Sequence, residues 1–418
     1  MRGVAEPTDL RARAEQLDRV DPLADLRQRF VLPPGVYLDG NSLGPLPRAV
    51  PDRLERVVRH EWGQGLIGSW NSAGWFTLPL RVGDRIARRV GAPPGSVVAG
   101  DSTSVQLFNT LVAAARLRPG RRTLVSDVAN FPTDGYVAGS VARLLGLDLV
   151  LVDPSEPLAL ARVLDGHLAV LTLSHVDYRT GVLHDMAAVT AAAHAAGGVV
   201  VWDLAHSAGA LPVDLMGAEA DFAVGCTYKY LDGGPGSPAF GFVHPRWHDV
   251  AEPPLTGWLG HATPFALEPE YRPAEGAARL RVGTPPVLSM AALDAALDVW
   301  DEVDIADVRA KSLALTDLFV EACQGLLEPF GVQVVVPREH ARRGSQVCLR
   351  HPDAYPVVQA LVERGVVGDF REPDLMRFGF TPLTLRHADV LDAVDVLADV
   401  LASQAWREPR FARRAAVT

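Results

Sequence analysis

The chain has 418 residues, 48% of them apolar and 22% charged, and its formal net charge is −10. This length favours a large domain with a smaller one, and the composition is ordinary for a soluble globular protein. The negative charge and the lack of a long basic stripe argue against nucleic acid as a partner. Arg407, Arg410, Arg413 and Arg414 form the only basic cluster, which we interpret as a solvated end.

The cysteine content and the hydropathy indicate the cellular compartment and the kind of protein. Cys226, Cys323 and Cys348 lack metal-site spacing, and such a sparse, odd set fits a reducing compartment. We therefore expect a cytoplasmic protein with no metal and no disulfide framework. The first ten positions carry charged residues, unlike a signal peptide, and no apolar run approaches ~18 residues, so the sequence predicts no membrane span and no membrane partner.

The N-terminal part is predicted to be helical and then irregular. Residues 8–30 show a helical pattern that the prolines and glycine at 33–35 end. Residues 37–45 follow as a short strand that enters a turn rich in Gly, Asn and Pro. We expect residues 1–60 to form an N-terminal segment that packs with the small domain.

Residues 61–305 are predicted to form the large domain. Strand-like apolar runs cover 123–127, 148–152, 168–173, 198–203, 221–225 and 239–243. Helix-like segments separate several of them, at 134–145, 157–165 and 185–197. This alternation predicts a mostly parallel sheet with helices on both faces. Ligands of such sheets bind at the carboxyl ends of the strands, where Ser174 and Asp203 fall.

A long Pro- and Gly-rich region at 251–286 precedes the C-terminal part, and loops of that length are usually functional or mobile. A helix at 288–303 is expected to bridge to the small domain. Residues 306–418 are predicted to form a smaller α+β unit, with strands at 331–336 and 345–350 and a final helix at 387–402.

The most informative pair of residues is an acid and a lysine. Asp203 ends an apolar run, and Lys229 follows 26 residues later in Tyr228-Lys229-Tyr230, before a Gly-rich stretch at 232–241. An enzyme that uses pyridoxal 5′-phosphate (PLP) needs a lysine to bind the cofactor aldehyde and a carboxylate to keep the ring nitrogen protonated. The structural alternative is that Asp203 caps the next helix and Lys229 is solvated.

A second signal is a candidate phosphate site. Thr103 and Ser104 precede a helical run over 105–117. The free N–H groups and the dipole of a helix N-terminus suit a phosphate, although a plain capped helix gives the same pattern.

Six blocks carry a resemblance to a known family. They read Tyr37-Leu-Asp-Gly-Asn-Ser-Leu-Gly44, Asn130-Phe-Pro-Thr-Asp134, Asp203-Leu-Ala-His206, Tyr228-Lys-Tyr-Leu231, Gly257-Trp-Leu-Gly-His261 and Gly283-Thr-Pro-Pro286. Together they resemble kynureninase over roughly residues 35–400.

The resemblance implies a PLP-dependent enzyme of class V with the aspartate-aminotransferase-like fold, fold type I. It implies an α/β large domain with a mostly parallel seven-stranded sheet flanked by helices, and a smaller α+β domain. The implied activity is hydrolysis of L-kynurenine to anthranilate and L-alanine, through a PLP ketimine and cleavage of the Cβ–Cγ bond, within tryptophan catabolism. The implied assembly is a homodimer with shared active sites.

The resemblance also assigns roles to individual residues. Lys229, Tyr228 and Asp203 are the implied catalytic residues. The implied cofactor contacts are Thr103, Ser104, Phe131, Asp134, Ser174, Asp203, His206, Tyr228, Lys229, Trp258 and Thr284.

Four residues are implied to contact the substrate. Arg377 matches the arginine that holds the substrate's α-carboxylate, a task that suits a planar, bidentate donor. Trp70, Asn41 and Ser42 complete this set. Family members that prefer 3-hydroxykynurenine tend to carry Asn where this chain has Thr284, so we expect unsubstituted kynurenine to be the better substrate.

Two alternatives remain open at the level of the sequence. A cysteine desulfurase or selenocysteine lyase of the same class needs a nucleophilic cysteine on a mobile loop, whereas Cys348 lies in a strand-like run. A non-catalytic protein with a PLP fold is the other alternative, against which the intact Asp203 and Lys229 argue.

Overall fold

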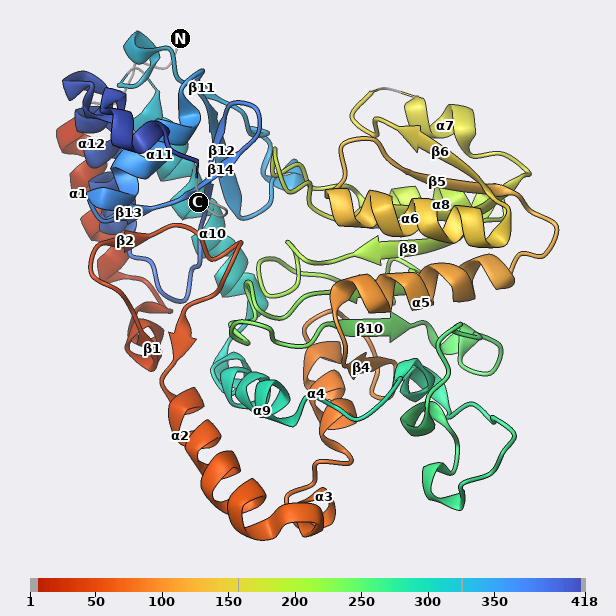
Figure 1. Cartoon of the computed structure of the whole chain (residues 1–418). Helices are drawn as coiled ribbons and strands as arrows, with labels where there is room; N and C mark the ends of the chain where they lie inside the picture. Colours follow the sequence, from red (N-terminus) through yellow and green to blue (C-terminus); the bar gives the residue numbers. More distant parts are fainter. Residues whose placement is uncertain (1–6, 157, 325, 415–418) are drawn as a thin grey trace.

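The computed structural model describes residues 7–156, 158–324 and 326–414, so the outermost residues of the expected N-terminal segment and small domain lie outside the described residues. Figure 1 shows a large domain beside a smaller one, with the N-terminal segment running from α1, on the small domain, to α2 and α3 below the large domain. The boundaries expected after residues 60 and 305 stay predictions. No helix in the described ranges has the length and apolar character to cross a membrane.

The large domain is built on a seven-stranded sheet in the order β4-β10-β9-β8-β7-β5-β6. Strands β5 to β9 pair in parallel, while β10 is antiparallel to β9 and β4. Every strand expected in this domain forms. The strands are β4 (Val97–Ala99), β5 (Thr123–Asp127), β6 (Asp148–Val152), β7 (Leu168–Ser174), β8 (Val199–Asp203), β9 (Phe222–Gly225) and β10 (Phe240–Val243).

Helices cover both faces of this sheet because both faces of its central strands are apolar. In β8, Val199 and Val201 belong to the core beneath α5 and α6, while Val200 and Trp202 belong to the core on the opposite face, beside α8. This is the pattern expected of a buried parallel sheet. The helices are α4 (Leu78–Ala87), α5 (Thr103–Arg116), α6 (Pro132–Leu145), α7 (Ala159–Val163), α8 (Met186–Ala195) and α9 (Val287–Ala296).

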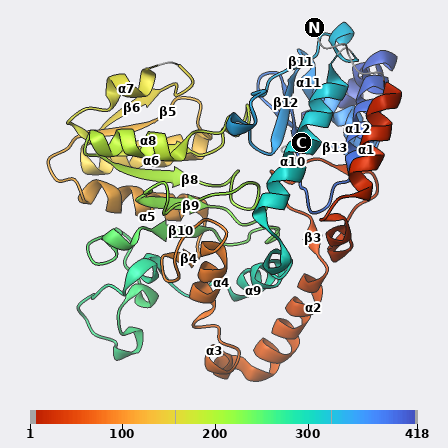
Figure 2. The same cartoon turned by 180° about the vertical axis from the view of Figure 1, so that it is seen from behind.

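The small domain carries a four-stranded antiparallel sheet in the order β11-β12-β15-β14, and a short parallel pair, β13 with β2. Figure 2 shows α10 where the small domain meets the large domain. The elements of the small domain are α10 (Ile305–Cys323), β11 (Gln333–Val334), β12 (Gln346–Arg350), α11 (Ala354–Glu363), β13 (Val366–Val367), β14 (Asp369–Arg371), β15 (Leu375–Gly379) and α12 (His387–Ser403).

The N-terminal segment touches both domains. Its first helix packs on α12 and α10, where Arg11 pairs with Asp392 at 2.6 Å, whereas α2 packs on α9 of the large domain. The elements are α1 (Pro7–Arg19), β1 (Phe30–Val31), β2 (Val36–Tyr37), β3 (Leu46–Pro47), α2 (Ala49–Arg56) and α3 (Ser69–Ser72).

Several helix predictions were too long. The helix expected over 8–30 ends at Arg19, and a separate 3-10 helix spans Ala24–Arg29, because Pro22 cannot continue an α-helix. The helix expected over 288–303 ends at Ala296 and is followed by a turn and the 3-10 helix Trp300–Glu302. The strand expected over 331–336 is reduced to the two residues of β11.

Candidate active site

A cavity of about 720 Å³ opens at the carboxyl ends of β7 and β8, beside the first turns of α5 and α6. The N-terminal segment contributes Asn41 and Ser42 to its wall, and the small domain contributes Arg371 and Arg377. The site is therefore a cleft at the junction of all three parts of the chain.

Most of the residues predicted for the site meet in this cavity. Those that line it are Asn41, Ser42, Thr103, Ser104, Phe131, Asp134, Ser174, Asp203, His206, Tyr228, Lys229, Thr284 and Arg377.

Lys229 lies in the loop after β9 and faces an imidazole. Its Nζ is 3.0 Å from Nε2 of His206, whose side chain is buried. Burial, together with the charge of Lys229, holds the pKa of His206 well below its usual range, so this ring is neutral. A neutral ring that accepts at Nε2 carries its proton at Nδ1, and that buried atom has no partner among the described residues.

Two carboxyl groups lie side by side in the floor of the cavity. Asp203 ends β8 and Asp134 lies in the first turn of α6, and both are almost fully buried. Burial raises the pKa of each, and the neighbouring Asp203 raises that of Asp134 further. Oδ1 of Asp203 accepts from the N–H of Ala205 at 2.6 Å. A structural role as a cap, the alternative that the sequence left open, therefore accounts for only one of the two carboxyl oxygens.

An aromatic ring stands at the mouth of the cavity. Phe131 occupies the N-cap of α6, where Pro132 sets the first helical residue, and its ring is 45% exposed. It meets Tyr178 edge to face, with 5.3 Å between the ring centroids. Ser174 at the end of β7 donates to Oδ1 of Asn130 at 2.7 Å. An exposed aromatic face at this position is available to stack on a flat ligand.

The N-terminus of α5 forms another wall. Ser102 is the N-cap and accepts from the N–H of Val105 at 3.4 Å, which leaves the first-turn amides at Thr103 and Ser104 without intrahelical acceptors. Tyr228 lines the same cavity, and burial, followed by the neighbouring Cys226, raises the pKa of its phenol, which keeps the hydroxyl protonated. These donors suit a phosphate group.

Arg377 lies in the middle of β15 and is almost fully buried. Its Nε donates to Asp369 at 2.8 Å, and the Nη atoms reach the carbonyl of Tyr178 at 2.8 Å and Oγ of Ser42 at 3.0 Å. Asp369 also pairs with Arg371 at 2.6 Å. The guanidinium is therefore held in one orientation at the edge of the cavity.

The turn after β2 is fastened to the lysine loop. The N–H of Gly44 donates to the carbonyl of Tyr228 at 2.7 Å. A Cβ at Gly44 would lie 2.2 Å from the carbonyl oxygen of Lys229, so this close approach requires glycine. The contact explains how Asn41 and Ser42, far from Lys229 in sequence, reach the site.

Two predicted residues lie outside the cavity of this chain. Trp70 packs edge to face on Trp75 and Trp258, with centroids 6.4 and 6.1 Å apart. Neither Trp70 nor Trp258 lines the cavity, whereas Thr284, expected from a partner subunit, lines the cavity of its own chain. The contribution of Trp258 and Thr284 across a dimer interface stays a prediction.

Two lining residues escaped the sequence analysis. Tyr178 follows Ser174 by four residues, and Arg371 precedes Arg377 by six. The position of Tyr178 just after a strand end was an available signal. Arg371 gave none, because its place depends on the antiparallel register that sets Asp369 opposite Arg377.

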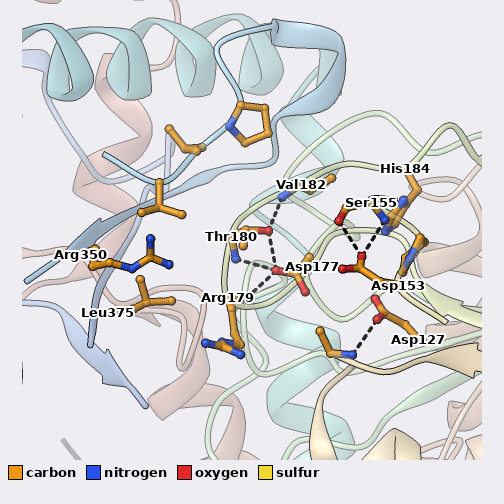
Figure 3. A pocket seen from close by; sticks show the side chains of 15 residues that line it. Asp127, Asp153, Ser155, Asp177, Arg179, Thr180, Val182, His184, Arg350 and Leu375 are labelled. Atoms are coloured by element: carbon orange, nitrogen blue, oxygen red, sulfur yellow. Dashed lines mark hydrogen bonds between the residues drawn. The ribbon is translucent and has the colours of Figure 1, made fainter. Parts of the chain in front are cut away.

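A second cavity, of about 430 Å³, lies between the domains (Figure 3). Asp127 ends β5 and Asp153 follows β6 of the large domain, while Arg350 and Leu375 face them from the small domain. Each of the two carboxylates accepts from a main-chain N–H two residues further on, at 2.7 and 2.9 Å. This cavity contains none of the residues that the sequence motifs identify.

The residues of the first cavity fit PLP. Lys229 offers an amine and is the cation that acts on the buried acid pair among the residues described, and a protonated ring nitrogen would add a second positive charge. Nδ1 of His206 has no partner at hydrogen-bond distance in the described part of the chain, although the side chain of Gln346 acts on the ring, and a cofactor oxygen would accept from it. The α5 N-terminus offers amides to a phosphate, and Phe131 offers a ring face.

Comparisons with known proteins agree with this geometry. A family model of the kynureninase C-terminal domain matches residues 308–397. A kynureninase from Burkholderia pseudomallei (strain 1106a) is 52% identical over 413 residues, which cover 98% of this chain and 99% of that protein. The chain belongs to the kynureninase family. A kynureninase from Pseudomonas fluorescens is 51% identical over 409 residues, 96% of this chain and 98% of that protein.

Solved structures similar to this kynureninase-family chain share its fold at low sequence identity. A cysteine desulfurase from Thermococcus onnurineus NA1 has a TM-score of 0.74 at 18% identity and covers 96% of this chain and 100% of its own. A C-DES mutant with glycine covalently linked to its PLP cofactor has a TM-score of 0.78 at 19% identity, over 89% and 99% of the two chains. The predicted fold and the predicted family are both confirmed.

Proposed function

We propose that this protein is a PLP-dependent hydrolase that converts L-kynurenine and water to anthranilate and L-alanine. The single observation that carries the proposal is the 52% identity to a kynureninase over nearly the whole chain. The cavity supports it, since an amine, a buried acid pair and a fixed guanidinium lie around one space large enough for a cofactor and an amino acid.

Each residue has a task in this reaction. When bound, PLP supplies an electron sink next to the substrate's α-carbon. Arg377 binds the α-carboxylate, and Lys229 Nζ moves the proton of the α-carbon. Asp203, ionised when it faces a cation, would keep the cofactor's ring nitrogen protonated, and Phe131 would offer its exposed face to the cofactor ring.

Tyr228 is the candidate for proton delivery to the β-carbon. Its phenol keeps its proton because burial raises its pKa, and it lines the same cavity as Lys229. Water adds its oxygen to the carbonyl carbon of the aryl ketone, and the Cβ–Cγ bond breaks with its electron pair left on Cβ. The aryl group leaves with that oxygen as the carboxyl group of anthranilate. Cβ takes the proton of Tyr228, which completes alanine, and a proton from the water restores the phenol. His206, neutral and beside Lys229, accepts a hydrogen bond from the lysine.

We further propose a homodimer. Large apolar side chains are exposed just before α3 and in the Pro- and Gly-rich region 251–286. Ile67 is 81% exposed, Phe265 70% and Leu267 84%. Phe265 packs on Trp258 at 5.7 Å between ring centroids, which in turn packs on Trp70. Exposed apolar surface around this aromatic cluster supports contact with a second copy of the chain.

Shared active sites can be tested by subunit mixing. Lys229→Ala and Trp258→Ala chains, each impaired alone, are unfolded together and refolded. Random pairing makes about half of the dimers mixed. If Trp258 serves the partner's site, each mixed dimer has one intact site of two, so about one quarter of wild-type activity returns. Activity no higher than the sum of the separate variants would show that Trp258 does not act across the interface.

The cysteine desulfurase alternative finds no support in the site. Cys226, Cys323 and Cys348 are free and buried, and none lines the cavity that contains Lys229. Burial also raises the pKa of each thiol, which disfavours the nucleophilic thiolate.

The free cysteines also support a reducing location, and we propose the cytoplasm.

The deciding experiment is direct. The PLP-loaded protein is incubated with L-kynurenine, and anthranilate is followed by its fluorescence, with alanine measured in parallel. Equal amounts of both products are expected, and Lys229→Ala should form neither. Absence of anthranilate from the wild-type protein, or full activity in the variant, would overturn the assignment.

A further inference from the structure

A second carboxyl group, Asp39, faces the arginine site. It follows β2, and its backbone forms an isolated bridge with Gly379 at the end of β15, the strand that carries Arg377. Asn41, with its amide turned to satisfy both ends, donates to Oδ1 of Asp39 at 3.3 Å and accepts from Nε of Arg377 at 3.0 Å. Asp39 and Arg377 are thus joined through one side chain.

The charges that act on Asp39 come from every neighbouring element. Asp369 on β14 repels it, while Arg371 on β14 and Arg377 on β15 attract it. The hydroxyl of Ser42, which donates to Asp369 at 2.9 Å, also favours the ionised form of Asp39. The phenols of Tyr37 and Tyr230 also lie in its field, and burial keeps both protonated. The charged groups of the cluster are therefore the carboxyls of Asp39 and Asp369 and the guanidinium groups of Arg371 and Arg377.

The charge of this cluster sums to zero when both carboxyls are ionised. A substrate carboxylate at Arg377 then adds a negative charge that no group in the cluster balances. Arg377 is almost fully buried, so water screens this excess poorly. Asp369 is fixed in ion pairs with both arginines, which leaves Asp39 as the carboxyl that can give up its charge.

We propose that Asp39 takes up a proton when the substrate's carboxylate binds at Arg377, so that the protein binds its anionic substrate together with a proton. The inference rests on the proposed function for the identity of that substrate. It makes Asp39 a residue that positions the substrate through Asn41 and Arg377, active in its neutral form.

The ionisation of Asp39 supports this assignment. Burial, followed by the charge of Asp369, raises its pKa to about 7. The carboxyl is therefore largely ionised at pH 8 in the free protein. An arriving anion disfavours the ionised form and raises the pKa further, which requires proton uptake, so affinity for the anion falls as pH rises above 7.

The test uses 3-benzoylpropionate, which carries the carboxylate and the aryl ketone of kynurenine but no α-amine. PLP-loaded protein is titrated by calorimetry at pH 8 in two buffers without primary amines that differ in ionisation enthalpy. The difference between the two heats gives the number of protons taken up. We expect uptake approaching one proton per site, and a dissociation constant that rises toward tenfold per pH unit between pH 7 and 8.5.

Two variants make the result specific. Asp39→Asn keeps the shape but stays neutral, so proton uptake should vanish and affinity at pH 8 should rise about tenfold, to the level of the wild type near pH 6. Asp127→Asn is the matched control, a carboxyl whose pKa burial raises to about 6 but which lies in the second cavity, and it should behave as the wild type.

The outcomes separate this inference from the proposed function. Uptake that persists in Asp39→Asn, a pH-independent dissociation constant in the wild type, or failure of the probe to bind would overturn the role of Asp39. Kynurenine hydrolysis would stand in each of those cases. If the probe binds together with a proton but L-kynurenine gives no anthranilate, the proposed function would be overturned and the proton linkage would stand.

Discussion

Asp203→Asn tests the electronic role of the strand-end carboxylate. In the structure Oδ1 of Asp203 accepts from the N–H of Ala205 at 2.6 Å, and an amide oxygen can accept the same bond. The substitution therefore keeps the local turn and removes the negative charge alone. We expect the variant to fold and to bind PLP with thermal stability close to that of the wild type.

The loss of activity follows from the burial of this charge. Asp203 is 6% exposed, so an effective dielectric near ~20 applies, and a carboxylate ~4 Å from a ring cation is worth about 4 kcal/mol. Removal of a single electrostatic stabiliser from an enzyme site costs a similar ~2.7–4 kcal/mol. At about 1.4 kcal/mol per factor of ten, kcat should fall by about 10²–10³-fold.

The assay is the release of anthranilate at saturating kynurenine, with PLP content measured by absorbance. Asp127→Asn is the matched control because Asp127 ends β5, two strands from β8 in the same sheet, and accepts from the N–H two residues on, at 2.7 Å. That variant should keep its activity. A loss below about tenfold in Asp203→Asn would refute the electronic role and leave Asp203 as a turn cap.

Other substitutions probe substrate binding and stability. Arg377→Lys keeps the charge but loses the planar fork, so KM for kynurenine should rise ~10–100-fold with a smaller change in kcat, and an unchanged KM would place the carboxylate elsewhere. Thr284 offers no amide to a 3-hydroxyl group, whose unpaired burial costs ~1–3 kcal/mol, so kcat/KM should favour kynurenine over 3-hydroxykynurenine, and the reverse preference would exclude Thr284 as the discriminator. Asp221 is 1% exposed and accepts from Trp247 at 2.8 Å and contacts His194 at 2.7 Å, so Asp221→Ala should destabilise the fold by ~3–5 kcal/mol in urea unfolding, and a loss below ~1 kcal/mol would contradict that account.

The sequence by itself predicted most of the large sheet and the polar residues at its strand ends. Apolar runs bounded by turns predicted six of the seven strands of the large sheet, all but β4, because a buried parallel strand must be apolar on both faces. Asp203 and Ser174 fell at strand ends, and parallel strands bring their carboxyl ends to one edge. The motifs around Lys229 then identified the family, which the comparisons confirmed.

Tertiary structure decided what depends on contacts between distant segments. The position of Asn41 in the same cavity as Lys229 required the close approach at Gly44. The pairing of Asp369 with Arg377 required a strand register that no local pattern encodes. Trp70, expected at the substrate, packs on Trp258 outside the cavity of its own chain. Local periodicity reports which faces are buried, whereas the partner of a buried charge is set by the packing of whole elements, and only the folded chain specifies it.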